Sequence, residues 1–184
     1  MRGNYESLAA LAAEVERISD AKHDLIVDTR HMKYLDDDGI AVDGHGAFAT
    51  SGYSRGQVAD RLGIQRKTWE RMGQFEGIRS HVVSEMWRQK PERRMVRTLD
   101  NTARAYLSDR FKPIDNDLVL AAILPTMQEH EGIHVVSRSL TPTKMYLQVV
   151  FPRIQGEVNV GDVVQAGATI TNSEVGAGAV DVSA

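Results

Sequence analysis

The spacing of apolar residues changes along this chain, and this change constrains the fold more than any other sequence feature. Residues 5–21 carry Leu8, Leu11, Val15 and Ile18 at helical spacing, which predicts an amphipathic helix that packs on the core or on a neighbouring subunit. Short β-like segments follow, then a helical stretch, and the last third is rich in strand-forming residues. We therefore expect an α+β fold in which helices pack on an antiparallel β-sheet.

Turn residues divide the rest of the chain into further predicted elements. Strands are predicted at 24–29, 32–35, 40–42, 95–99 and 103–107, with irregular β-structure at 44–48. Helices are predicted at 54–62, 66–74, 78–89 and 115–130, where Ser54 caps the first and Gly63 ends it. A C-terminal antiparallel meander is predicted from strands at 133–137, 144–151, 168–172 and 179–182.

The length of 184 residues and the absence of cysteine limit the classes of protein that this chain can form. The length favours one α+β domain over residues 1–184, with 54–89 as a helical subregion. Without cysteine there is no disulfide, zinc ribbon or thiol nucleophile. No apolar run approaches the roughly 18 residues that cross a bilayer, and the first residues do not resemble a signal peptide. We expect a cytoplasmic protein with no membrane partner.

Positive charge is concentrated in the middle of the chain. Residues 53–112 contain fourteen Lys/Arg and seven Asp/Glu, a local net charge of +7 in a protein whose net charge is −3. Both flanks are acidic, each with a net charge of −5. A basic segment of this kind is typical of surfaces that bind nucleic-acid phosphates.

The first part of the basic segment matches the spacing of a helix-turn-helix. Ala59 allows two helices to cross closely, Gly63 suits a left-handed turn, and Trp69 is the apolar residue six positions later. The second helix then begins with Gln65, Arg66, Lys67, Thr68 and Arg71. The candidate nucleic-acid contacts here are Arg66, Lys67 and Arg71 for phosphates and the Trp69 ring for stacking on bases. The alternative is a pair of short helices whose basic side chains are merely solvated.

The second part of the basic segment mixes arginines with aromatic residues. The candidate nucleic-acid contacts in it are Arg93, Arg94, Arg97, Arg104, Tyr106, Arg110, Phe111 and Lys112. Arginines that bind phosphates and rings that stack on bases would together form a groove for single strands. Alternatively, Asp100, Asp109 and Asp115 neutralise these arginines in ion pairs.

Residues suited to catalysis or metal binding are scattered. The six histidines share no spacing typical of a metal site, and the run from Asp36 to Asp38 is expected to be an exposed turn. No histidine is placed to activate Ser173, so we expect a tight turn in which Asn172 and Glu174 bond the backbone. No cofactor, metal or catalytic residue is predicted.

Several separated blocks resemble one known family. They are Ala59 to Ile64, Arg97 to Asp100, Arg104 to Phe111, Ile114 to Asn116, Gly161 and Asp162, Ile170 to Gly176, and Gly178 and Ala179. In this order, within residues 50–184, they are similar to the phage/plasmid-like proteins, a family of unknown function carried by bacteriophages and plasmids. The resemblance implies a phage or mobile-element protein in a bacterial cell and supplies no catalytic residues.

Three functional hypotheses follow from the sequence. The first is a non-enzymatic, homo-oligomeric phage protein that binds or anneals single-stranded DNA, with a role in recombination, through its basic region. The second is a helix-turn-helix protein that binds duplex DNA. The third is a scaffold whose basic middle docks on the acidic flank of a neighbouring copy.

Overall fold

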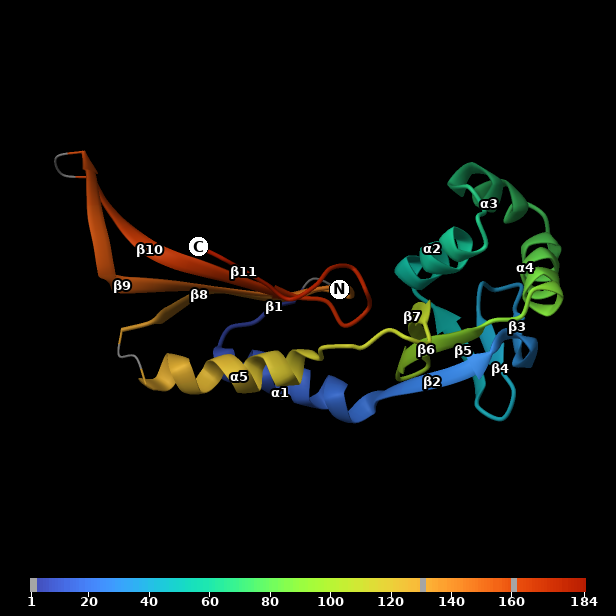
Figure 1. The fold of residues 1–184 in the computed structure, drawn as a ribbon, viewed down its shortest axis with the longest axis horizontal. Coiled ribbons are helices and arrows are strands. Elements are labelled where there is room, and N and C mark those ends of the chain that lie inside the picture. The colour runs from blue at the N-terminus through green and yellow to red at the C-terminus, as the bar shows by residue number, and fades with distance from the viewer. Residues whose placement is uncertain (1–2, 130–131, 160–161) are drawn as a thin grey trace. The chain divides into compact units, whose positions relative to one another are not determined.

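The computed structural model describes residues 3–129, 132–159 and 162–184 (Figure 1). By its contacts the chain divides into two compact units. Unit 1 comprises Met1–Asp20 and Pro113–Ala184, and unit 2 comprises Ala21–Lys112. The overall class is α+β, as the sequence predicts. A single domain over 1–184 stays a prediction.

Unit 1 contains a five-stranded antiparallel sheet and two helices. The sheet has the order β1 (Gly3–Asn4), β8 (His134–Leu140), β9 (Met145–Asn159), β10 (Asp162–Asn172) and β11 (Asp181–Ser183). Strands β8 to β11 form the predicted C-terminal meander, although β9 and β10 are longer than expected. The predicted N-terminal helix is α1 (Leu8–Ala21), and it buries Leu11, Val15 and Ile18.

Helix α5 (Asn116–Glu129) confirms the last predicted helix. It is less buried than expected, because Leu118 is exposed while Val119 and Leu120 are buried. His130, where the helix was predicted to end, and Gly161 lie outside the described residues.

Buried polar residues fasten the start of α5 to the end of β10. The Asn172 side chain donates from Nδ2 to the carbonyl of Ile114 and to Oδ1 of Asn116, each at 2.8 Å. The backbone N–H of Asn116 donates to Oε1 of Glu174 at 2.8 Å. The predicted bonding within a local turn is therefore replaced by contacts with residues 56 or 58 positions away, and these contacts place a carboxylate at the positive end of the helix dipole.

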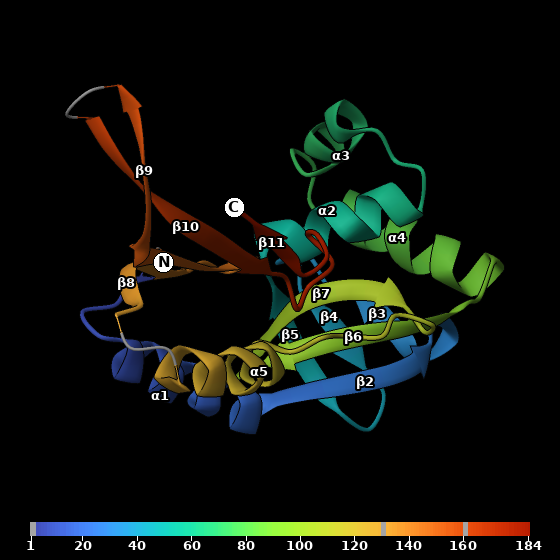
Figure 2. The ribbon, with the colours of Figure 1, turned by 60° about the vertical axis from the view of Figure 1, so that its left-hand side comes forward.

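Unit 2 contains a six-stranded sheet covered by three helices. The strand order is β2 (Lys22–Asp28), β6 (Arg93–Leu99), β7 (Thr102–Ser108), β5 (Gly46–Thr50), β4 (Ile40–Val42) and β3 (Met32–Tyr34), and a short 3₁₀ helix, Thr29–His31, joins β2 to β3. All neighbouring strands are antiparallel except β5 and β7, which are parallel. The helices, labelled in Figure 2, are α2 (Gly52–Arg61), α3 (Arg66–Met72) and α4 (Ile78–Gln89). Their bounds are close to the predicted ones.

The cap of α2 differs from the prediction. Ser51 has extended backbone angles, and its Oγ accepts the backbone N–H of Ser54 at 3.0 Å, so Ser51 is the N-cap. Ser54 lies one turn inside the helix and is fully buried, and its hydroxyl donates to the carbonyl of Ala103 at 2.7 Å. The predicted cap therefore attaches α2 to β7 instead.

Four aromatic rings form the centre of the unit 2 core. Trp87 stacks on Tyr106 with ring centroids 5.7 Å apart, and Tyr34 meets Trp69 and Trp87 edge to face at 5.6 and 6.0 Å. Val58, Val83 and Val96 are among the aliphatic residues buried around these rings. The helices are thereby held on the sheet by side chains from α2, α3 and α4.

Candidate nucleic-acid interface

Helices α2 and α3 are joined by the tight turn that the helix-turn-helix pattern predicts. The N–H of Ile64 donates to the carbonyl of Ala59 at 2.9 Å, and that of Gly63 donates to the carbonyl of Asp60 at 3.1 Å. This pair of bonds is a Schellman motif, and Gly63 adopts the left-handed conformation that it needs, with φ of 69°. Ala59 and Trp69 are both buried, as the pattern requires.

Replacing Gly63 with alanine is expected to lower the free energy of unfolding by about 1 kcal/mol, because a Cβ is disfavoured at this φ. Gly56 is the matched control. It lies exposed within α2 with nothing within 4 Å of a Cβ, so alanine there is expected to stabilise by about 0.5–1 kcal/mol. Urea titrations measure both values, and equal effects of the two substitutions would contradict the role assigned to the turn.

The first half of the predicted basic surface lies on α3 and faces solvent. Gln65, Arg66, Lys67, Thr68 and Arg71 are all exposed. Arg66 donates to Glu70 at 2.8 Å, an exposed pair whose charges are partly neutralised. Within the part of the chain that the structure describes, no carboxylate pairs with Lys67 or Arg71. These two cations are four residues apart and therefore lie on the same side of the helix.

The second half of the predicted basic surface is divided between core and surface. Arg94 and Arg97 are buried. Arg97 lies opposite Asp24 in the β2–β6 register and donates to it from Nε at 2.7 Å. Arg94 pairs with Glu92 and lies over the Tyr106 ring, 5.8 Å from its centroid. For these two arginines the prediction of a phosphate contact is wrong, because each is buried in an ion pair.

The aromatic residues predicted to stack on bases are also inside. Trp69 and Tyr106 are only 9% and 4% exposed and belong to the core described above, so neither ring offers a broad exposed face for a base. Burial also raises the pKa of the Tyr106 hydroxyl above its usual value. Phe111 is half-buried after β7. The groove for single strands that the sequence suggested therefore lacks its main stacking rings.

The remaining cations lie outside α2 and α3. Arg93, Arg110 and Lys112 are exposed and Arg104 is half-buried. Because Arg94 lies opposite Ser108, Arg93 and Arg110 are at the same end of the β6–β7 pair.

The two units carry opposite net charges. Unit 2 has seventeen Lys/Arg and thirteen Asp/Glu, a net charge of +4, whereas unit 1 has five and twelve, a net charge of −7. Two carboxylates of the acidic N-terminal flank, Asp24 and Asp38, belong to unit 2 and pair with its arginines. Part of the basic segment is thus neutralised within its own unit.

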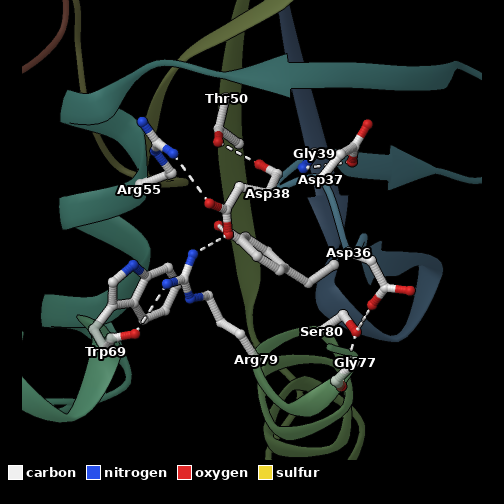
Figure 3. A network of polar contacts seen from close by, with 11 residues as sticks. Asp36, Asp37, Asp38, Gly39, Thr50, Arg55, Trp69, Gly77, Arg79 and Ser80 are labelled. Carbon is white, nitrogen blue, oxygen red and sulfur yellow. Dashed lines mark hydrogen bonds and ion pairs between the residues drawn. The ribbon is translucent and has the colours of Figure 1, made fainter. Parts of the chain in front are cut away.

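Sequence reasoning missed a polar network around Asp38, shown in Figure 3. Arg55 from α2 donates to Oδ2 of Asp38 at 3.0 Å, and Arg79 from α4 donates to Oδ1. Arg79 also donates to the carbonyl of Trp69 at 3.0 Å and lies 4.9 Å from that ring's centroid. Asp38 was predicted to be in an exposed turn, but its side chain is only 18% exposed. No spacing in the sequence signals this, because the three residues come from three separate elements.

The network makes a testable contribution to acid stability. Burial by itself would raise the pKa of Asp38, but the hydrogen bonds from Arg79 and Arg55 outweigh it and hold the pKa below the ordinary 3.8. The resulting stability is present above the unfolded-state pKa and is lost as pH falls through the lower folded-state pKa. We therefore expect Asp38→Asn to destabilise near pH 6 and to differ less from wild type near pH 3, measured by urea unfolding. Glu76 is exposed, so for the control Glu76→Gln the difference in unfolding free energy from wild type should be the same at pH 6 and pH 3.

The described residues contain no metal-binding cluster and no helix able to span a membrane. None of their His, Asp and Glu side chains gather in a group of three or more that could hold a metal ion. None of their helices combines the length and apolar character needed to cross a membrane.

Comparison with known proteins identifies no relative. No family model, curated protein or solved structure matches this chain. The similarity to the phage/plasmid-like proteins and the expected bacterial cytoplasm stay predictions.

Proposed function

We propose that unit 2 binds duplex nucleic acid through α3 of the α2–α3 helix-turn-helix. The observation that supports this most directly is the pairing of a buried anchor, Trp69, with exposed cations at Lys67 and Arg71 on one short helix. An α-helix is about 10–12 Å across with its side chains, which fits the roughly 12 Å width of the major groove, and the seven residues of α3 give it a length of about 10 Å. Gln65 and Thr68 are exposed beside these cations and supply groups able to bond base edges.

The duplex is favoured over single-stranded DNA because of where the aromatic rings lie. Binding of single strands relies on open ring faces, and Trp69 and Tyr106 are buried in the core. Docking of a recognition helix relies on exposed polar side chains, which α3 has. A homo-oligomer belongs to the proposal, since two copies of α3 about 34 Å apart would meet successive major grooves.

Fluorescence anisotropy with labelled oligonucleotides tests this function. The full chain is titrated against a duplex and against each of its single strands between about 50 and 200 mM salt. We expect tighter binding of the duplex, with log K falling against log salt at a slope of about −0.9 per phosphate contacted. Absence of binding at the lowest salt, or a preference for the single strands, would refute the proposal.

A second candidate function is supported by the charges of the units. Net charges of −7 and +4 would allow unit 1 of one copy to attract unit 2 of another. Mass measurement without nucleic acid distinguishes this scaffold from the duplex-binding protein. An assembly that grows at low salt, dissociates at high salt and ignores added DNA would favour the scaffold.

A further inference from the structure

A pocket of about 580 Å³ lies between α2, α3 and α4 of unit 2. One side of it is made by small residues on a single face of α2, namely Gly52, Gly56 and Ala59. The charged residues that line it are Arg55, Arg66, Arg79, Asp38, Asp60 and Glu70. The pocket therefore combines space with charged groups beside the helix that is proposed to bind nucleic acid.

The guanidinium groups in this pocket have more donors than the protein gives them acceptors. Arg55 and Arg79 both donate to the one carboxylate of Asp38. Arg79 places a second bond on the carbonyl of Trp69, yet its Nε is buried with no acceptor among the described residues. A buried donor without an acceptor is unfavourable, and because Nε is shielded from solvent, an oxygen ligand would remove that cost only if the Arg79 side chain turned towards it.

Two of the three carboxylates of the pocket are paired with arginines, and the third, Asp60, is exposed to solvent. Glu70 accepts from Arg66 at 2.8 Å, and Asp38 is bound by two arginines. The buried group without a partner is thus an N–H donor, Nε of Arg79. A ligand with acceptor oxygens suits this pocket better than a cation does. Tetrahedral phosphate oxygens are well suited to two converging guanidinium groups.

We propose that this pocket binds one phosphoryl group through Arg55 and Arg79. Asp38 acts as the positioning residue that holds the two guanidinium groups together, as Figure 3 shows. The proposal rests on the proposed function only for the source of the phosphate, which is either a nucleic-acid backbone or a free phosphate compound.

Gly73 provides a precise way to disturb Arg79. A Cβ added at Gly73 would come within 1.6 Å of Arg79 Nη2, and the backbone φ of −70° accepts alanine. Gly73→Ala should therefore displace the guanidinium without straining the chain. Arg55→Gln is the second variant, and it leaves Asp38 paired with Arg79. Arg88→Gln on α4 is the control, because Arg88 is exposed and pairs with Glu85 outside the pocket.

Isothermal titration of the full chain with inorganic phosphate tests the proposal, with circular dichroism to verify folding. We expect binding by wild type and by Arg88→Gln, and affinities roughly tenfold lower for Arg55→Gln and Gly73→Ala, as for loss of one charge-assisted hydrogen bond. No phosphate binding by wild type, or unchanged affinity in both folded variants, would overturn it.

Duplex binding by the same variants identifies the source. Weaker duplex binding by Arg55→Gln and Gly73→Ala would assign the pocket to a backbone phosphate, and unchanged duplex binding would assign it to a free phosphate compound. Phosphate binding that persists when the full chain binds no duplex would support the pocket while rejecting the proposed function.

Discussion

Replacing Trp87 with alanine is expected to lower the free energy of unfolding by about 3–5 kcal/mol, the largest stability change predicted for this protein. Trp87 is 1% exposed and contacts the Tyr34 and Tyr106 rings. Its removal leaves a cavity where α4 packs against β3 and β7, in addition to the lost transfer free energy of the indole. Urea unfolding followed by circular dichroism measures the change.

Phe75 is the matched aromatic control for Trp87. Its side chain is 58% exposed in the loop between α3 and α4, so alanine there should change the free energy of unfolding by less than about 0.5 kcal/mol. If Trp87→Ala cost no more than Phe75→Ala, the aromatic cluster would not be the centre of the core.

The double substitution Lys67→Gln and Arg71→Gln is expected to have the largest effect on binding. Both side chains are exposed on α3 and lack a carboxylate partner among the described residues, so their removal should leave the fold intact. If each contacts one phosphate, the dependence of log K on log salt should become shallower by about 2, with weaker binding to all duplex sequences. Anisotropy titrations at several salt concentrations give the slope directly.

The control for this variant removes the same number of positive charges from another helix. Arg88→Gln combined with Lys90→Gln removes two exposed positive charges from the end of α4. Its salt dependence should remain that of wild type if binding is localised to α3. Equal slopes for both double variants would indicate a diffuse electrostatic attraction rather than a site.

Local sequence signals predicted the secondary structure well because they act over a few residues. Gly63 at the end of α2 is a signal of this kind, and the structure confirms it. The pattern at 95–99 correctly predicted the strand β6, although its residues do not alternate between buried and exposed, because Arg94 to Thr98 are all buried. The cap at Ser51 was missed because both Ser51 and Ser54 are serines, a residue type that often caps helices. The two serines are distinguished only by the hydrogen bond of Ser54 to Ala103 of β7, which lies far away in the sequence.

The candidate site was predicted only in part, because charge in a sequence says nothing about pairing in space. Arg97 and Asp24 are 73 residues apart, and only the register of β2 on β6 brings them together. The helix-turn-helix spacing correctly places Trp69 on the side of α3 that packs on the core. A ring that packs on the core cannot also stack on bases. The exposed cations of α3 were predictable because the turn at Gly63 fixes the side of α3 that packs inward.

The discontinuity of unit 1 has a consequence for the order of folding during synthesis. The backbone N–H of Tyr5 donates to the carbonyl of Arg138, whose guanidinium donates back to Tyr5 across 133 residues of chain. At about 5–20 residues per second, the ribosome takes roughly 7 to 27 s to supply that partner. Unit 2 is contiguous and is complete before α5 is made. The 92 residues of unit 2 connect the two segments of unit 1. Once unit 2 has folded, the flexible chain between these segments is shorter, and less conformational entropy is lost when α1 and β1 pair with the later segment.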